Sequence, residues 1–452
     1  MNSLYQLSGR QFLMVCALVM PAFVIAQQDL SAHLMRQTWQ SNRSNPALLP
    51  DARFILSLPG LHNDFFIENV TYGDLIRQNA EGNDVLDVDH AISLLEPDNL
   101  IREHLDIETL GLGIRFGKIF LTGGHALRFQ AYLDYPKTLP QLIWQGNAQF
   151  IGQTVSFGPD IQLSGYHEWS IGAAAELLPG LTIAGRAKWL SGVADVSTSK
   201  RKLELSTSDD VYQLTLDADF QVNSAGSLTY NSFEDINLDF NFGKFDTERL
   251  FSKNSGFAFD LGLRFQKGNW DFAASVTDIG QIDWKDEVKN YAFQGIYEYK
   301  GLDVAQAILE DSTDFGSVLD TLEALYQPNE TALGYSSTLP VRTYLSAVWQ
   351  FNPNWKFSGL VHLERFQDQT YTAFALGAST RVIKLLELGG LYSIRRGSYA
   401  NIGLNATLDL GPLQVMAATD NIVTLIRPKD SHGAHVRVGV NLLFGRFEQE
   451  QK

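Results

Sequence analysis

The sequence predicts an all-β protein, a closed antiparallel transmembrane β-barrel of about 14 strands with helices in its extracellular loops. Three observations support this fold. Apolar and polar residues alternate over many segments of ten or more residues. The joins between these segments alternate between tight and mostly long ones, and no long join falls on the tight-turn side. The last segment has one fully apolar face and is followed only by a polar tail.

The last segment, HVRVGVNLLFGRF (435–447), illustrates the alternation. One side carries Val436, Val438, Val440, Leu442 and Phe444, and the other carries His435, Arg437, Gly439 and Asn441. A soluble sandwich and a membrane barrel both produce such a pattern. Strands of globular domains usually span about 5 to 6 residues, whereas membrane strands need about 9 to 11. The length therefore favours lipid as the solvent of the apolar face.

The strands are predicted at 53–72, 105–116, 118–134, 160–177, 181–200, 256–266, 269–284, 336–351, 354–367, 370–382, 384–397, 399–410, 412–424 and 434–447. An even number of strands puts both termini on the side of the tight turns, in the periplasm. The first and last strands must pair, because an open sheet edge in hydrocarbon leaves backbone groups without partners. Aromatic side chains near strand ends are predicted to form the interfacial girdle, namely Trp270, Trp284, Trp349, Trp355 and Phe447; in a soluble protein they would form the core.

The chain divides into four segments. Residues 1–26 are typical of a signal peptide, with Arg10 before the apolar run FLMVCALVMPAFVIA and cleavage near Ala26. A membrane anchor is disfavoured because this run is too short. Residues 27–52 are predicted to form a plug at the periplasmic mouth, 53–447 the barrel and 448–452 a polar tail. The single cysteine, Cys16, lies in the signal peptide, which excludes disulfides and thiol chemistry from the exported chain.

The net charge of −16 argues against nucleic acid as a partner, because a phosphate-binding surface needs clustered Lys and Arg. The acidic residues concentrate at 81–108 and 286–330, in predicted long loops. Helical spacing within these loops predicts helices at 89–105 and 303–326. Such helices would cover the pore, form a docking surface, or simply pack on the rim.

Motifs of enzymes and cofactor sites do not occur, so we expect no catalytic residues, no cofactor and no metal. His432 and His435 have the spacing of two metal ligands, but no third ligand stands near them in the sequence, and a solvated turn is the simpler interpretation. The protein is therefore not predicted to be an enzyme.

The alternation places charges of both signs on the lumen side. The predicted lumen-lining residues are Arg115, Arg128, Arg186, Lys188, Asp260, Arg264, Arg342, Lys356, Glu364, Glu387, Arg395, Asp409 and Arg437. Buried charges persist only when they are paired, which favours a lattice of ion pairs that fills the barrel. The alternative is an aqueous path whose charges tune selectivity.

Five stretches resemble a family: SNPALLPDARFILSLPGL (44–61), LIWQGNAQFIG (142–152), VTDIGQIDW (276–284), LPVRTYLSAVWQF (339–351) and TDNIVTLIRPKDSHGAHVRVGVNLLFGR (419–446). They resemble an uncharacterised outer-membrane barrel family of Bacteroidota, a domain of unknown function. That family is distantly similar to the FadL and PorV barrels, which have fourteen strands, and Asn45-Pro46-Ala47 before the first strand is reminiscent of theirs. The resemblance implies a fold and a compartment, the Gram-negative outer membrane, and no activity.

Two functions remain open. The first is a transporter or channel-like barrel for small or hydrophobic solutes, as the likeness to FadL implies. The second is a non-transporting partner or scaffold subunit of an envelope or secretion machine, as PorV is. The expected partners are outer-membrane lipid and lipopolysaccharide, the barrel-assembly machinery during insertion and, for the second function, an envelope protein.

Overall fold

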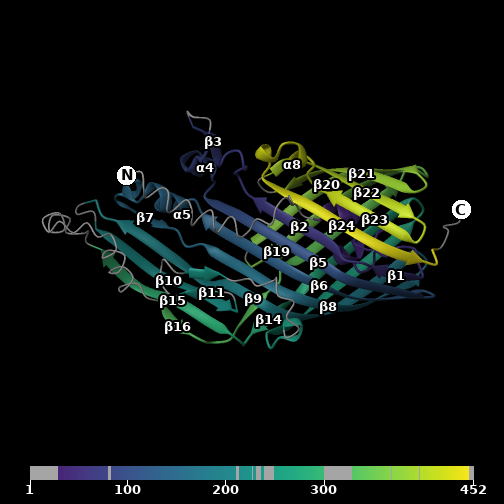
Figure 1. Ribbon diagram of the computed structural model, residues 1–452, viewed down its shortest axis with the longest axis horizontal. Helices are drawn as coiled ribbons and strands as arrows, with labels where there is room; N and C mark the ends of the chain where they lie inside the picture. The colour runs from purple at the N-terminus through teal and green to yellow at the C-terminus, as the bar shows by residue number, and fades with distance from the viewer. Residues whose placement is uncertain are drawn as a thin grey trace.

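The computed structural model describes residues 29–79, 83–209, 213–226, 228–230, 236–238, 249–299, 328–367, 369–395 and 398–446. In these residues the chain forms a closed barrel (Figure 1). Its wall strands are β1 and β2 (Phe54–Ser57, Gly60–Ile67), β5 (Asp98–Phe116), β6 (Ile119–Pro136), β8 (Asp160–Leu178), β9 (Leu181–Thr207), β13 (Ser255–Lys267), β14 (Trp270–Trp284), β17 and β18 (Tyr335–Thr338, Val341–Gln350), β19 (Trp355–Phe366), β20 (Gln369–Ile383), β21 (Leu386–Arg395), β22 (Ser398–Leu410), β23 (Leu413–Thr419) and β24 (Gly433–Phe444).

Each wall strand pairs antiparallel with its neighbours in chain order, and the first and last strands close the ring. Phe54 of β1 lies opposite Phe444 of β24, and Asp64 of β2 lies opposite His435. When β1 with β2 and β17 with β18 are each counted as one strand, the described wall has fourteen strands. The predicted fold class and strand number are therefore confirmed.

Two wall strands are interrupted at a proline. The chain leaves strand geometry at Leu58-Pro59, between β1 and β2, and at Leu339-Pro340, between β17 and β18. Proline has no backbone N–H to give to the ladder, so it breaks a central strand. The single strand predicted at 53–72 is accordingly two shorter ones, and it ends at Ile67.

The tight turns lie at one end of the barrel, where the C-terminus also lies (Figure 1). Gly117 and Gly268 occupy two of them with φ of 59° and 58°, a left-handed conformation that glycine adopts without strain. The longer connections lie at the opposite end, as the sequence predicted. They contain β3 (Ile76–Gln78), β4 (Asp84–Leu86), α4 (Val88–Leu94), α5 (Thr138–Pro140), η1 (Gln141–Gln145), η2 (Ala148–Phe150), β7 (Gln153–Ser156), β11 (Leu228–Tyr230), β12 (Ile236–Leu238), η3 (Arg249–Phe251), β16 (Asn329–Thr331), α8 (Val423–Ile426) and η4 (Pro428–Asp430).

The helix predicted at 89–105 is shorter than expected. Helix α4 ends at Leu94, and β5 begins at Asp98 and runs through the rest of the predicted helix. The residues from Asp98 pair with β6, beginning opposite Pro136. This pairing outweighs the local helical spacing. The helix predicted at 303–326 lies outside the described residues.

The wall extends beyond the membrane on one side. Strand β9 has 27 residues, far more than the roughly 9 to 11 that cross a bilayer, and its distal part pairs with β10 (Leu214–Ala225). Strand β10 pairs in turn with β15 (Val288–Tyr299) along its whole length. These strands form the projecting part on the left of Figure 1. The joins between the predicted strands 181–200 and 256–266, and between 269–284 and 336–351, thus contain extra sheet.

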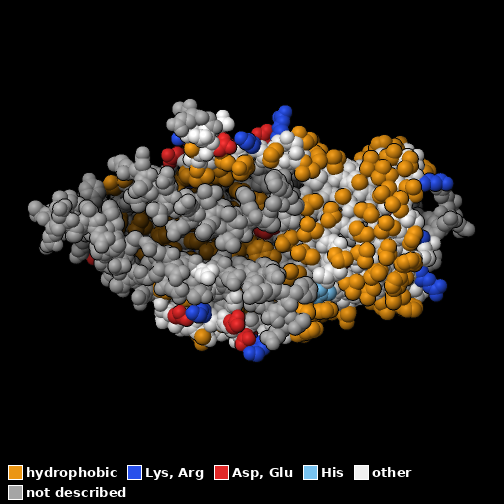
Figure 2. Space-filling model, viewed as in Figure 1, with side chains coloured by type: hydrophobic (Ala, Val, Ile, Leu, Met, Phe, Trp, Pro, Cys, Tyr) orange, Lys and Arg blue, Asp and Glu red, His pale blue; other side chains and the backbone are white. Residues whose placement is uncertain are grey.

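Apolar side chains cover the outer wall of the barrel on the face shown in Figure 2, toward the right. Exposed aliphatic and aromatic side chains alternate along the outer face, as at Phe257, Phe259 and Leu261 of β13. Such a surface fits lipid and not water. No helix among the described residues is both long and apolar enough to cross a bilayer.

The predicted aromatic girdle is correct only in part. Trp270, Trp349 and Trp355 lie exposed near the tight turns, and the rings of Trp270 and Trp349 stack with centroids 5.9 Å apart. Trp284 is fully buried instead, because a register shift in β14 between Val276 and Ile279 turns its side chain inward. Its indole N–H donates to Ser337. Phe447 lies outside the described residues.

This topology predicts which cysteines a membrane-impermeant thiol reagent reaches on intact cells. In a Cys16→Ser background, Ala148→Cys in η2 should be labelled, because it is exposed at the end with the long connections. Lys118→Cys, exposed in a tight turn, should be labelled only after the cells are broken. Labelling of Lys118→Cys alone on intact cells would show that the barrel is inserted the other way round.

Candidate functional site

The N-terminal segment, residues 29–52, lies inside the barrel. Nearly all of its residues are buried, including those of α2 (Leu30–Leu34) and α3 (Ser41–Ser44). The segment was expected at the periplasmic mouth, but it extends further. Its start, Asp29, pairs with Arg437, seven positions before the end of β24. The segment therefore runs along the lumen from beside Arg437 to the start of β1.

Side chains from around the wall hold this plug segment. Trp39 donates its indole N–H to Glu108 of β5 at 2.6 Å, and the amides of Gln40 and Asn441 of β24 bond to each other in both directions. Arg43 pairs with Glu168 of β8 at 2.7 Å. At the other end, both carboxylate oxygens of Asp420 accept the first backbone N–H groups of α2. Contacts to so many strands fix the position of the segment.

Glycines on the inner wall make room for the plug segment. A Cβ atom added to Gly111 would lie 2.5 Å from the indole nitrogen of Trp39, and one added to Gly262 would overlap Asn45. Real Cβ atoms do not approach other atoms so closely. Only glycine at these two positions allows the wall and the segment to pack together.

A network of buried charges lies beside the plug segment, with Asp278 of β14 at its centre. The Asp278 carboxylate accepts from Arg128 at 2.8 Å, Lys188 at 2.7 Å and Arg342 at 2.9 Å. Three cations from β6, β9 and β18 thus meet one carboxylate. Buried charges are stable in such a place only when they are paired in this way.

The backbone at Asp278 explains how this side chain reaches the lumen. Its φ is 63°, and the pairing of β13 with β14 shifts register at this level. Its N–H donates to Asp260 at 2.8 Å. Left-handed conformations of non-glycine residues are uncommon, and Asp tolerates them better than most. The bulge turns inward a carboxylate that strict alternation from Trp270, Phe272, Ala274 and Val276 would direct into lipid.

Two glutamates extend the network. Glu168 binds Arg43, Arg128 and Lys188, so it links the plug segment to the wall charges. Glu364 binds Arg342 at 2.8 Å and Arg102 at 3.3 Å.

Most of the predicted lumen residues have charged partners in the structure. Arg128, Arg186, Lys188, Asp260, Arg342 and Glu364 belong to the central network. Nearer the tight turns, the pairs are Arg264 with Asp271, Lys356 with Glu387 and Asp409 with Arg446, at 2.7–2.8 Å. Arg437 pairs with Asp29 at 2.6 Å. The sequence placed these charges on the lumen face but did not determine their partners.

The remaining two predicted residues contact aromatic rings. The guanidinium of Arg115 lies 5.0 Å from the ring centroid of Phe120 and near the carbonyl of Pro50. Arg395 is buried with its guanidinium 4.0 Å from the ring centroid of Phe66.

Sequence reasoning missed several residues of the network. Asp64, Arg102, Asp106, Glu168 and Asp278 were not among the predicted lumen charges, although all are buried or nearly so. Residues of the plug segment, such as Arg36 and Arg43, were missed because no strand alternation assigns them a side. One signal was available: Asp278 interrupts an apolar outer face, which indicates a bulge.

A polar cavity of about 40 Å³ lies within the network, room for about three water molecules. Five carboxylates, five Lys or Arg side chains and three histidines line it. The formal charges cancel when the histidines are neutral, so the cavity as a whole carries no net charge. A ring of like charges, which would select ions by their sign, is therefore not formed by these residues.

A closed barrel with an apolar outer wall defines a transmembrane β-barrel protein. The chain belongs to a family of unknown function, DUF5723, whose model matches residues 46–420. The predicted family is therefore confirmed, whereas its assignment to Bacteroidota stays a prediction.

The comparisons with individual proteins add little. No curated protein matches the chain. Similar solved structures include the toluene transporter TbuX of Ralstonia pickettii, with 10% identity, coverage of 90% of this chain and 93% of that chain, and a TM-score of 0.42. A FadL homologue of Pseudomonas aeruginosa has 8% identity, coverage of 90% and 91%, and a TM-score of 0.37. Likeness at this level says nothing about a substrate of this protein.

The network predicts that Asp278→Asn destabilises the barrel strongly. The change leaves three buried cations with one carboxylate fewer, and breaking a buried ion pair costs about 3 kcal/mol or more. Asp217→Asn removes an exposed ion pair with Lys202 in the projecting part of the sheet. This change should alter the stability little. Urea unfolding in detergent, followed by tryptophan fluorescence, measures both. Equal midpoints for the two variants would contradict the structural role of the network.

Proposed function

We propose that the protein is an outer-membrane transport barrel for small, apolar solutes, with the plug segment as the part that moves to let them pass. The observation that carries this proposal is the way the segment is held. Side-chain contacts, together with the N–H bonds of α2 to Asp420, hold it, and backbone bonds to the wall begin only at Arg53, where the segment ends. Side-chain contacts can be exchanged without unfolding a strand.

An inner apolar cluster supports the choice of solute. Its buried residues are Tyr166, Leu190, Ala225, Ala258, Ile282, Trp284, Val288 and Leu339. The cluster adjoins the charge network, since the Arg128 guanidinium lies 5.9 Å from the Tyr166 ring centroid. It lies toward the end with the long connections, so a solute from outside would reach apolar side chains before the plug segment. Contact with apolar side chains stabilises an apolar solute. A hydrated ion would have to give up its water there, which is unfavourable.

The compartment and the contacts belong to the same proposal. The signal peptide is cleaved near Ala26, the assembly machinery of a Gram-negative cell inserts the barrel, and lipid and lipopolysaccharide contact its apolar band. The protein acts without catalysis.

A second function deserves a test because the lumen is filled. A barrel whose inner charges are paired works equally well as a scaffold, and the projecting β9–β10–β15 sheet then offers a surface to an envelope protein. The two functions differ in what happens when the plug segment is removed.

Deletion of residues 29–44 distinguishes a plugged channel from a solid scaffold. In planar bilayers the intact protein should conduct little steady current, because the segment fills the lumen. The deletion variant should show large open steps, provided that heat-modifiable migration on a gel demonstrates a folded barrel. A folded deletion variant that remains silent would contradict the plug role.

Solute uptake is the companion measurement. Liposomes that contain the intact protein should take up a labelled apolar solute, such as a fluorescent fatty acid, faster than liposomes with Trp284→Asp, which puts a charge into the apolar cluster. Asp217→Asn serves as the control and should behave as the wild type. The scaffold function would be favoured over transport by two results together. These are equal uptake with all three proteins, and an envelope protein that cross-links to the barrel in stoichiometric amount.

A further inference from the structure

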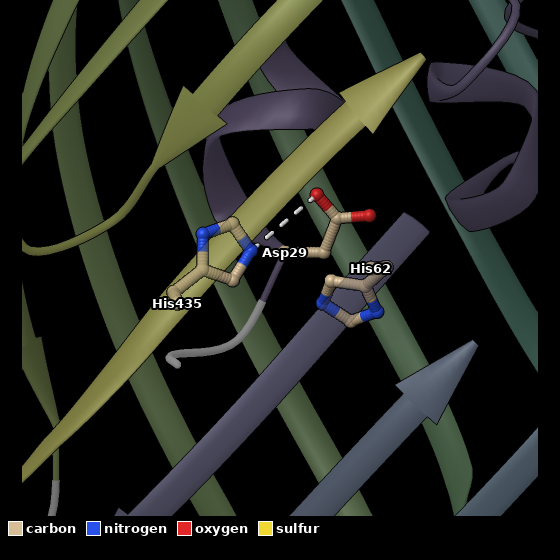
Figure 3. Close-up of side chains that lie close together, drawn as sticks. All are labelled: Asp29, His62 and His435. Carbon is tan, nitrogen blue, oxygen red and sulfur yellow. Dashed lines mark ion pairs between the residues drawn. The ribbon is translucent and has the colours of Figure 1, made fainter. Parts of the chain in front are cut away.

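The geometry points to a divalent metal site, of the kind that Zn²⁺ occupies, formed by Asp29, His62 and His435. Figure 3 shows the three side chains close together, with a ring nitrogen of His435 directed at the Asp29 carboxylate. One ligand atom from each residue lies within 4.8 Å of the others, and all three residues are buried. Two imidazoles and a carboxylate are a ligand set that suits zinc and leaves a fourth position open.

The unpartnered atoms carry the argument. Asp29 Oδ1, both ring nitrogens of His62 and His435 Nε2 are buried without a hydrogen-bond partner among the described residues. Buried polar atoms are nearly always satisfied, so unsatisfied atoms on all three residues of one cluster indicate a binding site. His435 Nε2 lies 3.9 Å from Asp29 Oδ1, a separation that one ion with bonds of about 2.1 Å spans.

Neighbouring groups hold the carboxylate of the site in place. The second oxygen of Asp29 is held by Arg437 at 2.6 Å, which fixes the orientation of the carboxylate. The Asp420 side chain lies 4.0 Å from His435 Nε2, so a second carboxyl group borders the site. Asp29 and His62 also line the polar cavity, which supplies space for a water molecule as fourth ligand.

Metal binding has one identifiable cost. The backbone N–H of Asp420 donates to His435 Nδ1 at 3.1 Å, so the proton of the neutral ring lies on Nε2. An ion at Nε2 displaces this proton to Nδ1, and the contact with Asp420 is then lost. His62 has only a longer contact, since its Nδ1 lies 3.7 Å from Asp106 Oδ2. Metal binding should also weaken as the pH falls, because protons compete with the metal for the imidazoles.

The position of the site gives it a structural role. His62 is on β2 and His435 on β24, the first and last strands of the barrel, and Asp29 begins the plug segment. A bound ion therefore connects the plug segment to the seam at which the barrel closes. This inference does not depend on which solute the barrel transports.

The test measures zinc in the purified, folded full-length protein, prepared without a histidine tag, stripped with chelator and then exposed to Zn²⁺ alone. We expect one tightly held Zn²⁺ per chain in the wild type and in His432→Ala, a neighbouring histidine that contacts the Val70 carbonyl. His62→Ala should bind at least tenfold more weakly. His62→Gln replaces it if His62→Ala does not fold.

A second readout separates this site from adventitious binding. Zn²⁺ should raise the temperature at which the wild-type and His432→Ala barrels lose heat-modifiable migration, and it should not do so for the His62 variant. The proposal is overturned if the wild type retains no stoichiometric zinc, or if the His62 variant retains as much as the His432 variant.

Discussion

Polar groups at the depth of a membrane must find partners within the protein, and this requirement determines both the wall and the interior. For the backbone, the requirement closes the sheet, so that β1 and β2 pair with β24 and no strand edge faces lipid. For side chains, it brings Arg128, Lys188 and Arg342 onto one carboxylate, Asp278. The filled lumen is a consequence, since a barrel of this size leaves inner polar groups that the wall alone does not satisfy.

The plug segment is part of this solution. Arg43 gives Glu168 a third cation, and Asp29 gives Arg437 its carboxylate. In return, Asp420 accepts the first N–H groups of α2, which lack partners within so short a helix. The wall and the segment thus complete each other's hydrogen bonds. If the segment moves as proposed, water or a ligand must replace these partners.

Much of the fold follows from the sequence because a barrel repeats one simple rule. Alternation assigns each strand residue to lipid or lumen, and the tight turns set the direction of the strands. Departures from regular geometry are harder to predict. Pro59 and Pro340 divide strands, and the bulge at Asp278 reverses the side of one carboxylate. Trp284 fits the girdle pattern, but the same bulge turns its ring inward, where it is buried.

The interior was less predictable, for a physical reason. Which charges pair depends on distances across the barrel, as between Arg102 of β5 and Glu364 of β19, and strand alternation contains no such information. The plug segment has no alternation at all, so its contacts could not be assigned. His435 shows the same limit, because its neighbours are His62 and Asp29 from distant parts of the chain and not His432, three residues away.

Hydrogen–deuterium exchange of the plug segment tests the central claim, that the lumen is filled by residues 29–52, most directly. The N–H groups of Leu30, Ser31, Thr38, Asn42 and Leu48 are hydrogen-bonded inside the barrel. In the folded protein, peptides from this segment should exchange nearly as slowly as those of β5 and β24. Exchange as fast as that of an unfolded peptide, in a barrel whose wall strands remain protected, would contradict the account.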